Sequence, residues 1–280
     1  MKPDEKPGSG QSAPIVSKPE WDAHLARVVK EMQEYTRKFV TPISRALDHD
    51  YGEHLATGNY VEIFGQKYLL TNAHVAEALR QHSLGHQFLD HECVFRATNP
   101  FFTFSLPFDV AFSAIDPKVW DDAQHSSLPI PESKLSMAHA PVDREVFFIK
   151  GFGGEGSDFH FGYLVTHATS YCCQEVPVPS EEPFNAQFHF ALDYRPDLAT
   201  TVEVNSRGLP IPKGLSGSVV WNTRFVELWG NGSDWNPDCA EVTGLLWGWP
   251  SSAACVVATR IEYVRSFLLR AITSMKSNNH

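Results

Sequence analysis

Apolar residues between Trp21 and Phe39 recur at spacings of three and four, with Lys, Glu and Arg between them. This period predicts an amphipathic helix. Ser17 can cap its first turn, and Pro19 suits a first-turn position. The Thr-Pro pair at 41–42 is expected to end the helix, because a residue before proline is biased away from helical geometry.

From residue 58 onward the pattern changes to short β-type runs. Residues 60–64 and 68–71 flank a Gly-Gln turn and predict a hairpin that leads into His74. A short helix is expected over 76–82, and further strands over 94–115. The segment 116–143 is rich in Pro, Ser and acidic residues and is interpreted as a connection.

The second half of the chain predicts more strands and then a helix. Many short strands separated by Gly and Pro turns indicate antiparallel barrels or sandwiches rather than a βαβ sheet. Helical spacing returns between Ile261 and Ile272. The predicted strands cover 146–150, 159–172, 186–194, 201–204, 218–221, 241–249 and 254–261. The expected organisation is a flexible tail (1–18), an N-terminal helix (19–48), two β units (50–140 and 145–262) and a C-terminal helix (261–275).

Composition narrows the classes of function. The formal net charge is −10 and no basic run occurs, which argues against nucleic acid as a partner. No stretch of about 18 apolar residues predicts a membrane span. The first residues lack the apolar core of a signal peptide, and the five cysteines are an odd number. A cytoplasmic protein with reduced thiols is therefore expected.

Three segments each carry one member of a His, Asp, Ser set. They are residues 70–75 (Leu-Thr-Asn-Ala-His-Val), 109–112 (Asp-Val-Ala-Phe) and 214–218 (Gly-Leu-Ser-Gly-Ser). A serine hydroxyl is a poor nucleophile until an imidazole takes its proton, and the imidazole needs a carboxylate to hold its tautomer. The chain order His, Asp, Ser is one of three in which unrelated folds build this geometry.

These segments resemble those around the catalytic residues of trypsin-like serine peptidases, and residues 148–153 resemble leaderless bacterial members of that family. Over about residues 55 to 272, the resemblance implies two antiparallel six-stranded β-barrels of the chymotrypsin type. It implies His74 as general base, Asp109 as orienting carboxylate and Ser216 as nucleophile. The glycines around Ser216 free the backbone, so the amides of Gly214 and Ser216 can face an oxyanion.

Two alternatives stay open within the set. Asp116 is a second candidate carboxylate, and Ser218 is a second candidate nucleophile that should point away along the following strand. The segment is not an α/β-hydrolase elbow, because Ser218 stands where that motif needs glycine.

The resemblance also suggests where a polypeptide substrate would lie. Residues 242–249 resemble the strand that borders the substrate, which makes Pro210, Leu246, Trp247 and Gly248 the expected substrate contacts. The segment 209–213 contains no acidic residue, so a basic P1 side chain is disfavoured unless Asp234, Asp238 or Glu241 supplies the charge.

One departure from the family concerns activation. In many secreted members an acidic residue precedes the nucleophile and pairs with a new N-terminal amine, but this chain has Leu215 there. Activation by N-terminal insertion is therefore not expected. Other packing must hold the oxyanion loop, or a regulatory protein partner must order it.

The remaining features lead to weaker hypotheses. His82, His86, Asp90, His91 and Cys93 fit no zinc spacing and are interpreted as a solvated helix and loop. The expected function is a serine endopeptidase that needs no cofactor or metal. The alternatives are a catalytically silent peptide-binding module on the same fold and a small-ester esterase.

Overall fold

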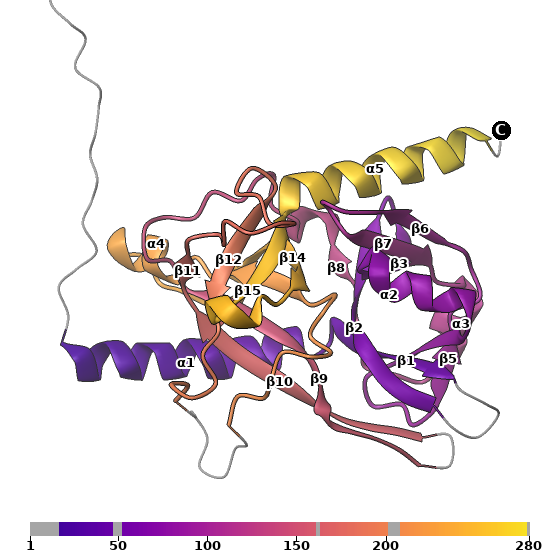
Figure 1. The fold of residues 1–280 in the computed structure, drawn as a ribbon, viewed down its shortest axis with the longest axis horizontal. Helices are drawn as coiled ribbons and strands as arrows, with labels where there is room; N and C mark the ends of the chain where they lie inside the picture. The colour runs from indigo at the N-terminus through magenta and orange to yellow at the C-terminus, as the bar shows by residue number, and fades with distance from the viewer. Residues whose placement is uncertain (1–16, 47–51, 161–162, 201–207, 279–280) are drawn as a thin grey trace, which may run out of the picture.

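The computed structural model describes residues 17–46, 52–160, 163–200 and 208–278 of the 280-residue chain. Figure 1 shows two curled β-sheets side by side. One long helix lies near the N-terminus of the chain and another near the C-terminus. This confirms the predicted all-β class with two consecutive antiparallel units. The predicted strand at 201–204 lies outside the described residues.

The first sheet contains eight strands in the order β5-β4-β1-β2-β3-β7-β6, with β8 parallel to β2. Its strands are β1 (Val40–Ala46), β2 (Gly52–Ile63), β3 (Gln66–Thr71), β4 (Ser83–Gln87), β5 (Val94–Arg96), β6 (Phe101–Phe104), β7 (Val110–Ala114) and β8 (Ile130–Pro131). The predicted hairpin is the β2–β3 pair, where Asn59 lies opposite Leu70. The described part of this half also contains four short helices: α2 (Ala73–Ala76), η1 (Glu77–Arg80), α3 (Pro117–Asp122) and η2 (Glu132–Lys134).

The second sheet contains seven antiparallel strands in the order β10-β9-β13-β14-β15-β12-β11. Its strands are β9 (Phe147–His160), β10 (Tyr163–Cys173), β11 (Glu175–Val176), β12 (His189–Asp193), β13 (Val219–Asn222), β14 (Glu241–Gly248) and β15 (Cys255–Arg260). The helices α4 (Phe225–Gly230), η3 (Pro237–Cys239) and η4 (Ser251–Ala253) lie between its later strands.

Each sheet contains more strands than the six that the family resemblance implied, because short segments pair with it. β5, β8 and β11 are only two or three residues long. When they are set aside, six strands remain in each sheet.

Each terminal helix packs against the half of the molecule that is distant in sequence. α1 (Lys18–Thr36) precedes the first sheet but contacts the second, where the Tyr35 and Trp221 ring centroids lie 5.8 Å apart. α5 (Ile261–Asn278) follows the second sheet but crosses the first (Figure 1), where the rings of Phe267 and Phe112 lie 5.5 Å apart. The two helices therefore help to hold the sheets together.

Two local predictions were wrong. The first β unit begins at Val40, ahead of the expected boundary near residue 50, because β1 pairs along β2 despite containing Pro42. The expected solvated segment 82–93 contains β4, in which the His86 side chain is buried against Tyr60. Polar composition hid this strand, since tertiary pairing decides its burial.

Candidate active site

His74 and Asp109 form a hydrogen-bonded pair at the start of α2. The His74 Nδ1 atom lies 2.5 Å from Asp109 Oδ2, and the His74 backbone N–H donates to Asp109 Oδ1 at 2.9 Å. A carboxylate only accepts, so Nδ1 carries the proton and Nε2 of the neutral ring is left as a base. The Asp109 side chain is 5% exposed, whereas that of His74 is 48% exposed, and its Nε2 has no hydrogen-bond partner among the described residues.

The backbone of Asp109 has the left-handed conformation, with φ of +50°. Few non-glycine residues adopt it, although Asp is among those that tolerate it best. This geometry turns the carboxylate toward both donors of His74 at the entry to β7.

Ser216 lies in a tight turn that contacts both sheets. Thr57 N donates to Ser216 O at 2.9 Å, and Gly217 N donates to Leu246 O at 2.8 Å. Gly217 has φ of +89°, and a Cβ there would overlap the Thr57 carbonyl oxygen. Glycine is therefore required for the turn to reach β2.

The turn leaves two amides unused. Gly214 has φ of +95°, and within the described residues neither its N–H nor that of Ser216 has a hydrogen-bond partner. Buried backbone donors are nearly always paired, so free ones in a turn are a feature of anion-binding loops. These are the two amides that the sequence singled out for an oxyanion.

Leu215, the residue before Ser216, is an apolar anchor for this turn. Its side chain is 1% exposed and packs in a core cluster with Ile149, Tyr194 and Val220. Buried apolar contacts therefore fix this position of the turn.

The described residues do not bring all three proposed catalytic side chains into hydrogen-bonding contact. No hydrogen bond joins the Ser216 hydroxyl to the ring of His74 in the part of the chain that the structure describes. The alternatives fit less well. Asp116 caps α3 through Lys118 N at 2.9 Å, and the Ser218 hydroxyl is fully buried.

The expected substrate contacts divide into two groups. Trp247 and Gly248 are partly exposed at a bulge in β14, and Trp247 packs beside Phe184 at 5.4 Å. Leu246 is 2% exposed, and both its N–H and C=O bond to the Ser216 turn. It therefore supports the turn from within the core. Pro210 is partly exposed, and its carbonyl accepts from Tyr194 Oη at 2.8 Å.

Sequence reasoning missed the residues that support the Ser216 turn. The Thr57 hydroxyl accepts from Phe152 N at 2.8 Å and donates to Gly214 O at 2.9 Å. Asn59 Nδ2 donates to Gly217 O at 2.6 Å. The only local signal was their polarity within an apolar strand, where a buried polar group needs a partner.

His54 is a third residue beside this turn that sequence reasoning missed. Its Nε2 lies 2.9 Å from Phe152 O, while its Nδ1 is buried without a partner among the described residues. Burial lowers the pKa of His54, and the hydrogen bond to Phe152 partly opposes that shift.

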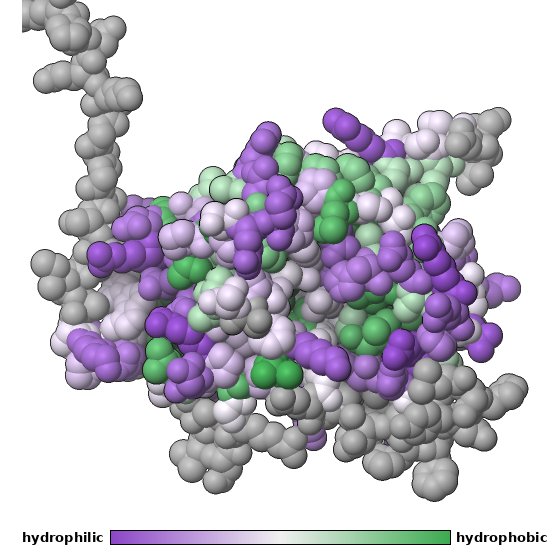
Figure 2. All heavy atoms as spheres, viewed as in Figure 1, coloured by the Kyte–Doolittle hydropathy of each residue, from purple (hydrophilic) through white to green (hydrophobic). Residues whose placement is uncertain are grey.

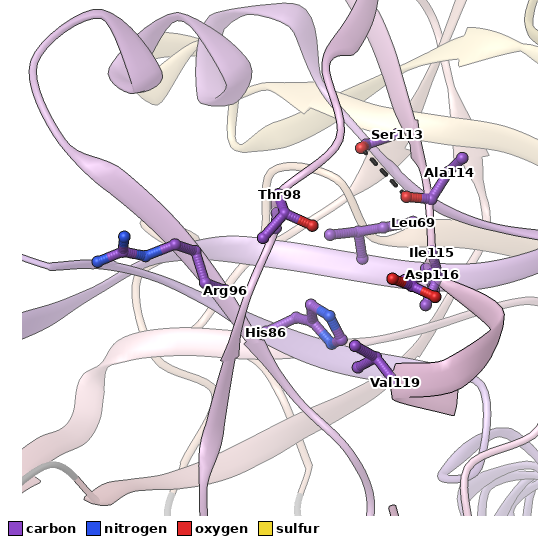
Figure 3. Close-up of a pocket in the computed structure, with 10 residues that line it drawn as sticks. Leu69, His86, Arg96, Thr98, Ser113, Ala114, Ile115, Asp116 and Val119 are labelled. Carbon is purple, nitrogen blue, oxygen red and sulfur yellow. Dashed lines mark hydrogen bonds between the residues drawn. The ribbon is translucent and has the colours of Figure 1, made fainter. Parts of the chain in front are cut away.

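The structure also contains two hollows that are not lined by His74, Asp109 or Ser216. A cavity of about 20 Å³ in the first sheet is lined by His86, Asp116 and Val119 among others (Figure 3). It has room for about one water molecule. A larger open groove of about 610 Å³ lies between β1, residues 87–92 and the β9–β10 pair, and Phe152 is part of its wall.

The surface gives little indication of other ligands. On the face in Figure 2, apolar residues form separate patches among polar ones. Across the described residues, no group of three or more His, Cys, Asp or Glu is arranged to hold a metal ion. No helix in the described ranges has the length and apolar character that a membrane crossing requires.

Comparison with known proteins gives structural neighbours only. No protein-family model and no curated protein matches the chain. It is similar to a structure reported for coupled folding and binding of the Sesbania mosaic virus VPg protein (14% identity, TM-score 0.42, 82% of this chain and 90% of that one). It is also similar to tobacco etch virus protease complexed with product (12%, 0.43, 80% and 72%) and to Vibrio cholerae VesB protease (14%, 0.43, 82% and 63%).

Proposed function

We propose that the protein is a serine endopeptidase that works through an acyl-enzyme. The observation that carries the proposal is the His74–Asp109 pair with an open Nε2, together with two free amides in the Ser216 turn. Acyl transfer to a serine needs a general base in a fixed tautomer and hydrogen-bond donors that are already oriented toward the oxyanion.

In the proposed mechanism the Ser216 hydroxyl attacks the carbonyl carbon of a peptide bond. His74 Nε2 takes the hydroxyl proton, and Asp109 stabilises the resulting imidazolium through Nδ1–H. The N–H groups of Gly214 and Ser216 bind the oxyanion. His74 then gives the proton to the leaving amine as the C–N bond breaks, which leaves an ester on Ser216. Water, deprotonated by His74, attacks this ester, and the carboxylic acid leaves as Ser216 regains its proton.

Catalytic hydrogen bonds often tighten only when substrate binds, so in the proposed mechanism the Ser216 hydroxyl reaches His74 Nε2 in the substrate complex. The absence of a Ser216–His74 hydrogen bond among the described residues favours a second candidate function. A protein with the same turns but a misaligned serine would bind a peptide without cleaving it.

A peptide-library digestion separates these functions. The endopeptidase predicts internal cleavage that is lost in both Ser216→Ala and His74→Ala. A binding module predicts intact peptides that bind the wild type and Ser216→Ala equally in fluorescence polarisation. Hydrolysis of small esters with no peptide cleavage would instead identify an esterase.

A further inference from the structure

Three consecutive carbonyls in the Asp109 turn each accept a hydrogen bond from a buried side chain. The carbonyls belong to residues 107–109. In chain order, their donors are His189 Nε2 at 2.6 Å, Thr259 Oγ1 at 2.6 Å and Asn72 Nδ2 at 2.7 Å. All three donor residues are 0% exposed.

The donors come from distant parts of the chain. They are separated from their acceptors by 82, 151 and 37 residues. His189 and Thr259 lie opposite each other in the β12–β15 pair of the second sheet. Two of the three side-chain donors to the Asp109 turn therefore belong to the second sheet.

His189 is held as a neutral donor. Its Nδ1 accepts from the Asn185 backbone N–H at 3.0 Å, and its Nε2 faces a carbonyl. A backbone N–H only donates and a carbonyl only accepts, so the ring proton must be on Nε2. Burial lowers the pKa of His189, the bond to the Pro107 carbonyl opposes that shift, and the charge of Arg260 adds to the lowering.

The turn needs this support because its conformation is unfavourable by itself. Asp109 has φ of +50°, and the described donors to its carboxylate are both on His74. Hydrogen bonds on its own carbonyl and on the two preceding carbonyls fix the peptide planes on either side of the residue. Those planes decide where the carboxylate points.

We propose that Asn72, His189 and Thr259 are positioning residues that hold Asp109 against His74. This role rests on the proposed function, since it assigns the three side chains to the catalytic pair. A purely structural role would make the same variants unstable but would leave the His74–Asp109 bond unchanged in the folded protein.

The test compares two near-isosteric changes. Thr259→Val removes one donor to the turn. Thr223→Val is the matched control, because Thr223 is also 0% exposed and its hydroxyl donates to Val146 O at 2.7 Å in the same half of the molecule. Thr259→Ser retains the donor and should rescue.

The readout is the proton resonance of His74 Nδ1–H in protein labelled with ¹⁵N-histidine, assigned by its loss in His74→Gln. We expect Thr259→Val to move or abolish this resonance and to lower kcat by about 10- to 100-fold with little change in KM. Thr259→Ser and Thr223→Val should keep both properties. A folded Thr259→Val protein with an unchanged resonance would overturn the proposal.

If Thr259→Val does not fold, Asn72→Ala is measured in the same way, and an unchanged resonance there also overturns the proposal. The resonance needs no turnover, so the two hypotheses can fail separately. If the wild type cleaves nothing and Thr259→Val still moves the resonance, the peptidase function is wrong and the positioning role stands. If Ser216 is active and Thr259→Val changes neither resonance nor kcat, only the positioning role is wrong.

Discussion

The turns that carry Asp109 and Ser216 both contact the two sheets and both receive hydrogen bonds from buried side chains, but only the Ser216 turn also depends on glycine geometry and an apolar anchor. The Asp109 turn is held by polar side chains that donate to its carbonyls. The Ser216 turn receives such bonds from Thr57 and Asn59, and it depends in addition on glycine backbone geometry and on the buried side chain of Leu215. The Asp109 turn should be sensitive to the loss of single hydrogen-bond donors and to acid. The Ser216 turn should be most sensitive to changes in side-chain volume at Gly217 and Leu215.

The largest effect is expected from adding a methyl group to the Ser216 turn. Gly217→Ala places a Cβ on the Thr57 carbonyl oxygen and must displace the neighbouring free amides of Gly214 and Ser216. Labelling by a fluorophosphonate probe should fall by at least about 100-fold. Gly65→Ala is the control, because Gly65 has φ of +77° with open space around it. It should label normally, and normal labelling of Gly217→Ala would contradict this account of the turn.

Removing the apolar anchor should have the next largest effect. Leu215→Ala deletes a side chain that is 1% exposed, which should lower the free energy of unfolding by about 2–5 kcal/mol in chemical denaturation. Leu198→Ala, at a residue 63% exposed, should change it by less than about 0.5 kcal/mol. Equal effects of the two changes would show that Leu215 does not anchor the turn.

A smaller effect is expected from the one polar support of the Ser216 turn that bridges two backbone groups. Thr57→Val leaves Phe152 N–H and Gly214 C=O without their partner. The expected cost is about 1–3 kcal/mol, measured by thermal or chemical unfolding, because buried groups are left unpaired. Thr57→Ser keeps the hydroxyl and should remain close to wild type. If both variants are equally stable, the bridge contributes nothing.

The smallest effect concerns pH and the Asp109 turn. The folded state holds the pKa of His189 below its ordinary value of about 6.5, chiefly through burial. Just below pH 6.5 the unfolded chain therefore binds a proton that the folded chain does not, so stability falls as pH falls. The slope from this group is at most about 1.4 kcal/mol per pH unit.

His189→Gln keeps a donor to the Pro107 carbonyl but cannot titrate. Its unfolding free energy, measured from pH 7.5 to 5.5, should depend less on pH than that of the wild type. His167→Gln, at an exposed position, is the control for the effect of a His-to-Gln change on stability at pH 7.5. A His189→Gln slope equal to that of wild type would remove the expected acid sensitivity of this turn.

Local patterns predicted the parts of the fold that local residues determine. Alternation at 60–71 predicted the β2–β3 hairpin, and the spacing of Leu25, Val28 and Met32 predicted α1. β1 was missed because Pro42 interrupts a short run, and its pairing with β2 decides its structure.

In the site, too, local sequence predicted some residues, whereas long-range contacts determine the others. The motifs identified His74 and Asp109, and the structure places them in contact. They could not identify His189 or Thr259 as partners of the Asp109 turn, because those hydrogen bonds join residues 82 and 151 positions apart. Such contacts arise from sheet packing, which no window of neighbouring residues encodes.

The central claim is that Ser216 is a nucleophile activated by His74. The most direct measurement is reaction of the folded protein with a fluorophosphonate probe, with the modified residue located by peptide mass spectrometry. We predict labelling on Ser216 that is lost in His74→Ala, with Ser218 unmodified. Labelling at another residue, or none in the folded wild type, would contradict the claim.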